Sequence, residues 1–317
     1  MRVLVLTAAD RLPNLNALYG MLGCHLPIEV LRLSKNQQRH LGETLAGLDL
    51  SVFQRVLLDL PFRHIRGQAR CLSGLAGLVI YEEDACQNYL EGSRYRGQFS
   101  RFYRRVPQAR VVVTGAALAE RLCAEGVAAS FMAKGFDSTR LFAEVGPRDI
   151  ELGFIGRTAS KSYQQRKALL EQLAEVEPLQ LLRTEPGDAY RHMLNRIQVF
   201  VSADIGLGEY MAKNFEAMAC GCLVLAWRQR VEEAAIGLEE GKHLLLYSSL
   251  DELRGQLARL RREPLLLQSV AKNGQAFVEE HLTYLHLAAR LSHVLQLPVR
   301  ELPSPSGWRH WWSRLRA

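Results

Sequence analysis

The chain has 317 residues, of which 48% are hydrophobic and 23% are charged, and it contains 24 Gly and 11 Pro. This length suits about two domains, and the composition excludes a disordered chain, a collagen-like repeat and a low-complexity scaffold. The 40 Lys and Arg outnumber the 33 Asp and Glu and give a net charge of +7, which favours an anionic partner without identifying one.

Short apolar runs alternate with longer segments of helical period through the first half of the chain. The runs predict strands at Val3–Leu6, Ile28–Leu33, Val56–Leu60, Leu78–Tyr81, Val111–Thr114 and Ala128–Met132. In the segment Ala116–Glu125, the residues Leu118, Leu122 and Cys123 fall on one helical face. Strand, helix and strand repeated in this way predict a parallel sheet with helices on both faces.

The alternation pauses near Gly146-Pro147 and then restarts. Further strands are expected at Glu151–Ile155, Leu179–Leu182, Val199–Ser202, Cys222–Ala226 and Leu244–Tyr247, and helices at Lys161–Glu175, Leu250–Arg262, Pro264–Glu280 and Thr283–Leu295. We therefore expect an α/β chain with two parallel-sheet domains, residues 1–147 and 148–297, that face each other across a cleft. Ligands of such sheets bind beyond the carboxyl ends of the strands, so the cleft is the expected active site.

The cysteines and the N-terminal segment bear on cellular location. The 6 cysteines are scattered through a long chain, which favours reduced thiols and a cytoplasmic protein. Cys220 and Cys222 form a C-x-C pair with no second pair nearby, so a buried turn is favoured over a metal site. Asp10 interrupts the first apolar run, which indicates a strand rather than a signal peptide, and no run has the length of a membrane-spanning helix.

A first candidate site follows the strand Glu151–Ile155. The chain continues through Gly156 and Arg157 into a polar stretch and then a helix, an arrangement that presents backbone N–H groups to an anion. Arg157 and Lys161 add the positive charge that a diphosphate requires. An ordinary Gly-Arg turn is the alternative interpretation.

A second candidate site begins with a glycine loop at 204–209 and continues into a short helix. Lys213 and Glu216 are three residues apart and share one face of this helix, which Gly221 ends before the next apolar strand. A surface Lys–Glu pair on a packed helix is the alternative interpretation.

The segment Phe215–Ala226 resembles the donor-site helix of nucleotide-sugar glycosyltransferases with the GT-B fold, in the group 1, CgeB-like branch. The segments 132–142, 154–157 and 243–284 are similar to further parts of that family, so the resemblance covers roughly residues 105 to 292. It implies a GT-B fold of two Rossmann-like domains, with the acceptor side in 1–147 and the nucleotide-sugar donor side in 148–297.

The resemblance also implies how the donor is held. Glu216 is expected to bind the ribose hydroxyls, while Lys213 and Arg157 face the diphosphate. The expected donor-binding set is Gly156, Arg157, Lys161, Lys213, Asn214 and Glu216. A UDP-sugar is the expected co-substrate, and no metal ion is required because the cations replace it. Many retaining members carry an acid at the position of Gly208; the nearest acid here is Glu209, so the stereochemical class stays open.

The acceptor-side domain is expected to supply a general base, since transfer with inversion requires a carboxylate or His within reach of the acceptor hydroxyl. Asp10 lies just past the first strand, and Glu82, Glu83 and Asp84 lie just past the strand Leu78–Tyr81. The catalytic candidates are Asp10, Glu82 and Asp84, each with a helix N-cap as its alternative role.

The stretch Ser93–Arg105 contains five arginines interleaved with aromatic residues and no acid. We favour an amphipathic helix in which Tyr95, Phe99, Phe102 and Tyr103 are partly buried and the arginines lie in solvent. Contact with an anionic acceptor, lipid-linked or phosphorylated, ranks second, and nucleic acid is not an expected partner.

Residues 298–317 have the composition of a Pro- and Ser-containing linker followed by a tail with most of the chain's 4 tryptophans. Trp308, Trp311 and Trp312 recur at helical spacing among arginines. This pattern predicts a short helix in the headgroup region of a membrane, with a tail docked on its own protein as the alternative.

With the resemblance, these features predict a glycosyltransferase that moves a sugar from a nucleotide-diphosphate sugar to a hydroxyl of a cell-envelope glycan. The expected acceptor is lipopolysaccharide core oligosaccharide, and the expected location is the cytoplasmic side of a bacterial inner membrane, as a peripheral protein. The alternatives are a GT-B nucleotide-sugar epimerase or hydrolase, and a non-catalytic GT-B-like binding protein.

Overall fold

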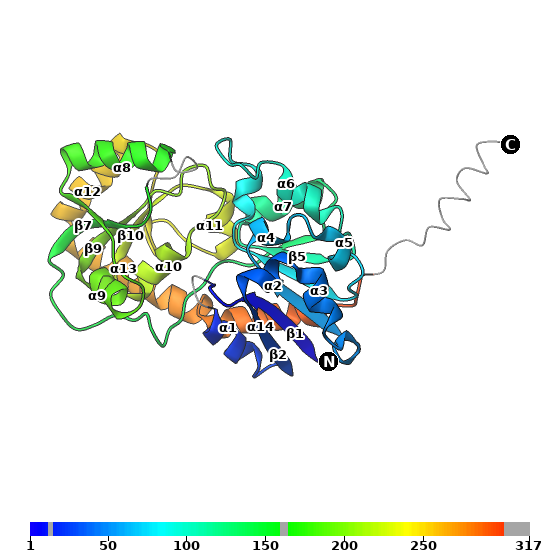
Figure 1. The fold of residues 1–317 in the computed structure, drawn as a ribbon. Helices are drawn as coiled ribbons and strands as arrows, with labels where there is room; N and C mark the ends of the chain where they lie inside the picture. Colours follow the sequence, from blue (N-terminus) through cyan, green and yellow to red (C-terminus); the bar gives the residue numbers. More distant parts are fainter. Residues whose placement is uncertain (12–14, 159–163, 301–317) are drawn as a thin grey trace.

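The computed structural model describes residues 1–11, 15–158 and 164–300, which form two α/β domains side by side (Figure 1). The N-terminal domain is built on a parallel sheet with the strand order β2-β1-β3-β4-β5-β6. Its strands are β1 Val3–Ala8, β2 Ile28–Leu33, β3 Arg55–Asp59, β4 Leu78–Glu82, β5 Arg110–Val113 and β6 Ala129–Phe131. Its helices are α1 Asn16–Leu22, α2 Lys35–Arg39, α3 Leu41–Ala46, α4 Phe62–Ile65, α5 Ala69–Leu72, α6 Gln98–Tyr103 and α7 Ala116–Ala124, with short 3₁₀ turns at Leu50–Val52 and Ala85–Asn88.

The C-terminal domain has a second parallel sheet, with the order β11-β10-β9-β7-β8. Its strands are β7 Ile150–Ile155, β8 Leu179–Leu182, β9 Ile197–Ser202, β10 Leu223–Trp227 and β11 Leu245–Tyr247. The helices that follow are α8 Gln164–Val176, α9 Asp188–Arg196, α10 Ala212–Ala219, α11 Val231–Ile236, α12 Leu250–Arg262, α13 Pro264–His281 and α14 Tyr284–Gln296.

The two sheets share one winding. In each sheet the second and third strands flank the first: β2 and β3 flank β1, and β8 and β9 flank β7. The chain therefore moves from β1 toward one edge of the first sheet and from β3 toward the other edge, so the strand order reverses between β1 and β3. The order of the second sheet reverses in the same way between β7 and β9. Such a reversal opens a crevice beyond the carboxyl ends of the strands, which is where open α/β sheets bind ligands.

The central strands are apolar throughout because helices cover both faces of each sheet. In β1, Val3 and Val5 contribute to a core with α1 and α14, while Leu4 and Leu6 contribute to the core on the opposite face. This alternation follows from the period of two in a strand, and the burial of both faces explains why the sequence shows continuous apolar runs.

The chain passes into the C-terminal domain after β6 and returns after α13, so that α14 packs on α1 of the N-terminal domain (Figure 1). The two passages touch: the Phe136 N–H donates to the Leu282 carbonyl at 3.1 Å, and the Tyr284 N–H donates to the Phe136 carbonyl at 2.9 Å. A Cβ on Gly135 would lie 2.2 Å from the Leu282 carbonyl oxygen, so this approach requires glycine. The predicted range 148–297 thus includes a helix that packs on the N-terminal domain, because a helical period gives the apolar face of a helix but not its partner.

The predicted elements coincide with the observed ones. The described strand ends differ by at most two residues, as in Val199–Ser202 against β9 Ile197–Ser202. The predicted start of one helix at Lys161 lies outside the described residues. In the described ranges, no helix is long and apolar enough to cross a membrane.

Candidate functional site

The short helix α10 is fixed at its C-terminal end by a glycine cap. Gly221 has φ +79°, a left-handed conformation that glycine adopts without strain. Its N–H donates to the Met218 carbonyl at 2.8 Å, and the Cys222 N–H donates to the Ala217 carbonyl at 3.0 Å. These two bonds form a Schellman motif, which stops the helix and leads directly into β10. The motif thereby fixes the face of α10 that lies beside the carboxyl end of β7.

Lys213 occupies that face. Its Nζ donates to the Ile155 carbonyl, the last of β7, at 2.9 Å. The next residue is Gly156, where an added Cβ would lie 2.8 Å from Phe154 Cζ and 3.6 Å from Lys213 Nζ, so the approach of the Phe154 ring favours glycine beside the ammonium group. Burial lowers the pKa of Lys213, and the exposed Arg157 acts in the same direction while Glu216 opposes it. Two neighbouring cations at the end of β7 suit a diphosphate.

Glu216 lies one turn further along α10 and is half-buried. Its Oε2 accepts a hydrogen bond of 2.6 Å from the Tyr190 hydroxyl, which comes from α9 after the neighbouring strand β8. Burial raises the pKa of Glu216, although the Tyr190 hydrogen bond and the Lys213 charge act against it. The Tyr190 ring also lies below Lys213, with Nζ 5.7 Å from its centre. Tyr190 was not predicted, and no local sequence signal marks it.

Asn214 is buried beneath these residues. Its Nδ2 donates to Asp204 Oδ2 at 2.8 Å, and the same carboxylate accepts from the Met211 N–H at 2.9 Å and from Arg166 Nη2 at 2.7 Å. The buried Asp204 therefore ties the start of α10 to the end of β9. The structure gives Asn214 a contact inside the domain, and its contact with a donor stays a prediction.

A charged cluster occupies the strand reversal of the N-terminal domain, at the carboxyl ends of β1, β3 and β4. Arg11 Nε donates to both oxygens of Asp59, at 2.9 and 3.0 Å, and its Nη2 donates to Glu83 Oε2 at 2.5 Å. Asp59 is buried and also accepts from the hydroxyls of Thr7 at 2.9 Å and Tyr19 at 2.5 Å. Arg11 and Asp59 were not predicted as site residues. Their only sequence signal is their position, Arg11 just after β1 and Asp59 at the end of β3.

The predicted catalytic acids lie around this cluster rather than within it. Asp10 is exposed and pairs with Lys35 at 3.4 Å. Glu82 is buried, and its Oε1 accepts from the backbone N–H of Asp84 at 2.9 Å; burial and then the Asp84 charge raise the pKa of Glu82 well above its usual value. Asp84 is exposed. Glu83, between them, is the acid of this loop that joins the cluster.

The ends of the two sheets interact electrostatically where the domains meet. The charge of Glu83 in the N-terminal domain raises the pKa of Glu216 in the C-terminal domain. The charges of Glu83 and Glu216 both raise the pKa of Tyr284, at the start of α14. Glu216 of α10 and Glu83 of the Arg11 cluster therefore act on each other across the domain boundary.

Glu209 is fully buried where the domains meet. Its Oε2 lies 3.0 Å from Lys134 Nζ and accepts from the Thr114 hydroxyl at 2.6 Å, so the C-terminal loop before α10 contacts the N-terminal domain. Burial acts to lower the pKa of Lys134, but the Glu209 carboxylate outweighs it and the pKa is raised. A Cβ on Gly115 would lie 2.4 Å from the Gly208 carbonyl oxygen, which shows how closely the two backbones approach.

A second carboxylate crosses between the domains. Glu232, buried in α11, accepts hydrogen bonds from the backbone N–H groups of Ala116 at 3.0 Å and Ala117 at 2.9 Å. These are the first residues of α7, so the side chain of one domain caps a helix of the other, where the helix dipole favours a negative charge.

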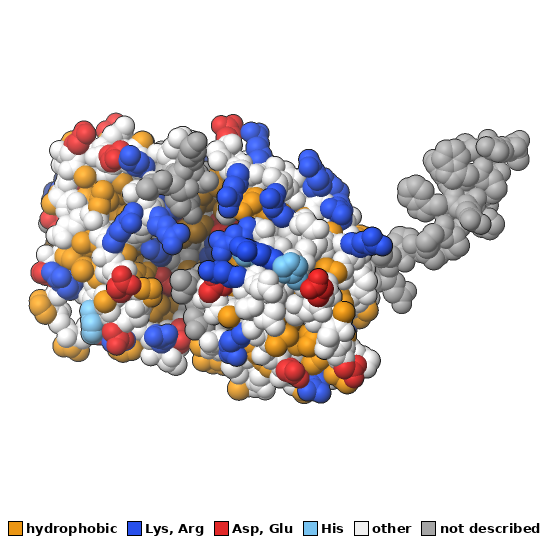
Figure 2. All heavy atoms as spheres, viewed as in Figure 1, with side chains coloured by type: hydrophobic (Ala, Val, Ile, Leu, Met, Phe, Trp, Pro, Cys, Tyr) orange, Lys and Arg blue, Asp and Glu red, His pale blue; other side chains and the backbone are white. Residues whose placement is uncertain are grey.

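The basic stretch Ser93–Arg105 is helical only over α6, Gln98–Tyr103, while its burial pattern agrees with the amphipathic interpretation. Tyr95, Phe99, Phe102 and Tyr103 are buried, and Phe62 stacks on Phe99 with ring centres 3.6 Å apart. The five arginines of the stretch are exposed. Figure 2 shows Lys and Arg side chains gathered on the face where the two domains meet.

Three further predictions remain, on Lys161, on the C-terminal tryptophans and on the Cys220–Cys222 pair. Lys161 and the tryptophans Trp308, Trp311 and Trp312 lie outside the described residues. Cys222 is buried, and its Sγ contacts the Leu194 carbonyl at 3.1 Å. Within the described ranges, no group of three or more His, Cys, Asp and Glu is arranged to hold a metal ion.

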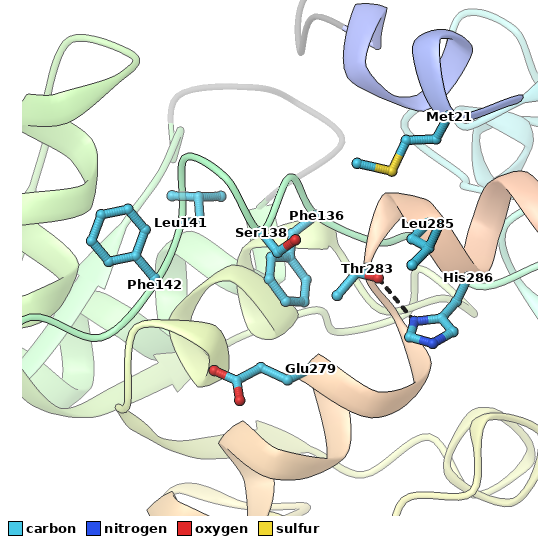
Figure 3. Close-up of a pocket in the computed structure, with 9 residues that line it drawn as sticks. All are labelled: Met21, Phe136, Ser138, Leu141, Phe142, Glu279, Thr283, Leu285 and His286. Atoms are coloured by element: carbon cyan, nitrogen blue, oxygen red, sulfur yellow. Dashed lines mark hydrogen bonds between the residues drawn. The ribbon is translucent and has the colours of Figure 1, made fainter. Parts of the chain in front are cut away.

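A separate apolar pocket lies where the passages between the domains meet α1 (Figure 3). Phe136 and Leu141 come from the first passage, Met21 from α1, and Thr283 bonds His286 Nδ1 at 2.8 Å on its rim. None of the residues that line it belongs to the donor-side helix or to the Arg11 cluster.

Comparisons place the chain among known proteins. Residues 164–293 match the family described as "Glycosyl transferase-like". The chain is similar in structure to Anabaena Alr3699/HepE in complex with UDP, at 13% identity and a TM-score of 0.67, over 93% of this chain and 99% of that one. A HepE structure with UDP and glucose gives 11% identity, a TM-score of 0.66 and coverage of 94% and 100%. Sucrose-phosphate synthase from Thermosynechococcus elongatus gives 10% identity, a TM-score of 0.66 and coverage of 99% and 100%. No curated protein sequence matches the chain.

Proposed function

We propose that this glycosyltransferase-like chain, which has the GT-B fold, moves a sugar from a UDP-sugar to a hydroxyl of a cell-envelope glycan. The predicted GT-B fold is confirmed by the architecture, and the match of residues 164–293 to the glycosyl transferase-like family supports the enzyme class. The donor, the acceptor and the roles of individual residues belong to the proposal.

One observation carries the proposal: a half-buried acid and a half-buried base share the exposed face of α10 at the reversal of the second sheet. The Glu216 carboxylate accepts from Tyr190 and retains lone pairs for the two hydroxyls of a ribose. The Lys213 ammonium lies beside Gly156 and near Arg157, where a diphosphate would receive both positive charges. The spacing of the face thus matches a nucleoside diphosphate, with ribose and phosphates in sequence along the helix.

The same cations explain how the leaving group departs. Transfer breaks the bond between the anomeric carbon and the diphosphate oxygen, and the electron pair leaves with the nucleotide. Lys213 and Arg157 stabilise the charge that develops there, a contribution that preorganised cations make without a metal ion. UDP is the nucleotide we favour, in keeping with its presence in the HepE complexes.

The donor site is tested by thermal stabilisation with UDP, GDP and ADP. A ligand that binds only the folded state raises the Tm with the logarithm of its concentration over its Kd. We expect UDP to stabilise the wild type, and Glu216→Ala to weaken binding about tenfold or more because a charge-assisted hydrogen bond is lost. The exposed Glu175→Ala, in α8 of the same domain, serves as the matched control and keeps the response. An equal response of Glu216→Ala and wild type contradicts the donor site.

The acceptor is proposed to be lipopolysaccharide core oligosaccharide, reached by a peripheral protein at the inner membrane. Support comes from the sequence of the tail, with Trp308, Trp311 and Trp312 among arginines, and from the exposed arginines of the stretch Ser93–Arg105. Sedimentation with vesicles tests the membrane contact. We expect binding to vesicles that contain phosphatidylglycerol, with loss of binding in the chain truncated after Arg300, and equal sedimentation of both forms contradicts it.

A further inference from the structure

The acceptor-side wall of the cleft presents one acid in a defined setting. Glu83 Oε2 accepts from Arg11 Nη2 at 2.5 Å, and Glu83 Oε1 accepts from the Tyr81 hydroxyl at 3.1 Å. Each carboxylate oxygen has two lone pairs, so both retain capacity for a further hydrogen bond. The Glu83 side chain is 16% exposed, which leaves it accessible from the cleft.

The contacts at the end of β4 explain why Glu83 and not its neighbours occupies this place. Glu83 follows Glu82, the last residue of β4, and accepts a hydrogen bond from the Tyr81 hydroxyl. Tyr81 belongs to the core beneath α1 and α14, whereas Glu82 is buried and binds the Asp84 backbone. Asp84 is exposed.

The charge of Glu83 acts on groups across the domain boundary. Its carboxylate raises the pKa of Glu216 across the cleft and contributes to raising that of Lys134. Burial acts to raise the pKa of Glu83 itself, but Arg11 and then Lys134 outweigh burial and lower it, so the carboxylate is ionised at neutral pH. The other acid of this region, Glu209, is fully buried in its pair with Lys134.

We propose that the transfer proceeds with inversion and that Glu83 is its general base, an assignment that rests on the proposed function. Its carboxylate accepts a hydrogen bond from the acceptor hydroxyl and takes the proton as that oxygen attacks the anomeric carbon. One carbon–oxygen bond forms and the bond to the diphosphate breaks, the electron pair leaving with the nucleotide toward Lys213 and Arg157. The proton then passes from Glu83 to solvent.

Arg11 is a positioning residue in this scheme. It bonds Asp59 through Nε and Glu83 through Nη2, and the buried Asp59 is itself held by Thr7 and Tyr19. The guanidinium therefore holds the Glu83 carboxylate in a fixed position relative to the sheet. Its positive charge keeps Glu83 ionised before the reaction.

The test compares Glu83→Gln with wild type in two assays on the full chain. The first measures Tm with UDP, and the second measures UDP release from a panel of UDP-hexoses, with water or core oligosaccharide as the acceptor. Glu83→Gln keeps size and hydrogen bonding but does not take a proton, so UDP release falls about 100-fold or more while stabilisation by UDP is unchanged. Glu83→Asp keeps the charge and recovers part of the rate. The exposed Glu91→Gln, from the same domain, is the control and keeps the wild-type rate.

The outcomes separate this assignment from the proposed function. UDP release by Glu83→Gln within about threefold of wild type overturns the assignment of the base. Loss of release in Asp84→Asn or Asp10→Asn, with Glu83→Gln active, moves the role to those acids and also overturns it. A wild type that UDP, GDP and ADP all fail to stabilise contradicts the proposed function instead.

Discussion

Two side chains on one face of α10 respond to burial in opposite ways. Burial lowers the pKa of Lys213 and raises that of Glu216, because each charged form loses hydration. The Tyr190 hydroxyl and the mutual attraction of the two charges act against these shifts. The site is thus prepared for a ligand that carries hydroxyl donors for the carboxylate and an anion for the ammonium group.

The raised pKa of Glu216 predicts the pH dependence of nucleotide binding. A raised pKa means that the carboxylate takes up its proton at a higher pH than an ordinary Glu, so affinity for UDP falls as the pH drops toward that raised value. Calorimetry between pH 8 and pH 5 measures it. Glu216→Gln provides the control, since any remaining pH dependence then belongs to the nucleotide phosphates. Parallel curves for the two proteins contradict the role of Glu216.

At the residue scale, the sequence indicated the donor side better than the acceptor side. Lys213 and Glu216 are local in the chain and share a helical face, so their spacing alone brings them together. Arg11, Asp59 and Glu83 come from three separate strand ends and meet only through the strand order. The contacts at the end of the strand Leu78–Glu82 distinguish the two acids, since Glu83 bonds the Tyr81 hydroxyl and Glu82 bonds the Asp84 backbone.

At the scale of elements, glycine decides where α10 ends. Gly221 supplies the left-handed residue of the Schellman motif, and a Cβ there would also lie 2.6 Å from Arg148 Nη2. The strands and helices were predictable because burial on both faces leaves a continuous apolar run. The packing of α14 on α1 was not, since an apolar helical face fits either domain.

The left-handed conformation of Gly221 predicts that replacing it by alanine lowers the stability of the protein. Gly221→Ala forces an L residue into the left-handed region and is expected to lower the free energy of unfolding by about 1–2 kcal/mol. Gly255→Ala is the matched control: Gly255 lies inside α12 with no atom within 4 Å of its added Cβ. That change is expected to be stabilising by about 0.5–1 kcal/mol. Urea unfolding measures both, and equal effects of the two substitutions contradict the role of the cap.

At the scale of the whole molecule, two buried carboxylates of the C-terminal domain extend into the N-terminal domain. Glu209 pairs with Lys134, and Glu232 caps α7. Glu209 lies in the loop before α10, and Glu232 lies in α11, which follows β10. Contacts of these buried carboxylates therefore fix the relative position of the two domains close to the candidate site.

Removal of the Glu232 contact is expected to destabilise the start of α7. Glu232→Ala leaves the first N–H groups of α7 without their acceptor, and an N-cap of this kind contributes about 0.5–2 kcal/mol. Hydrogen exchange at Ala116 and Ala117 is expected to accelerate, while exchange in the sheet of the C-terminal domain is unchanged. Uniform acceleration throughout the chain contradicts a contact confined to the domain boundary.

The paired passages at Phe136 and Tyr284 have a mechanical consequence. Because the two segments are hydrogen-bonded to each other and pressed together at Gly135, they act as one pivot rather than as two independent tethers. Sliding of one passage along the other would break both bonds. A displacement of one domain against the other that keeps these bonds must bend the two passages together, and it must also break the Glu209–Lys134 pair, so the hinge and the charge contacts resist it jointly.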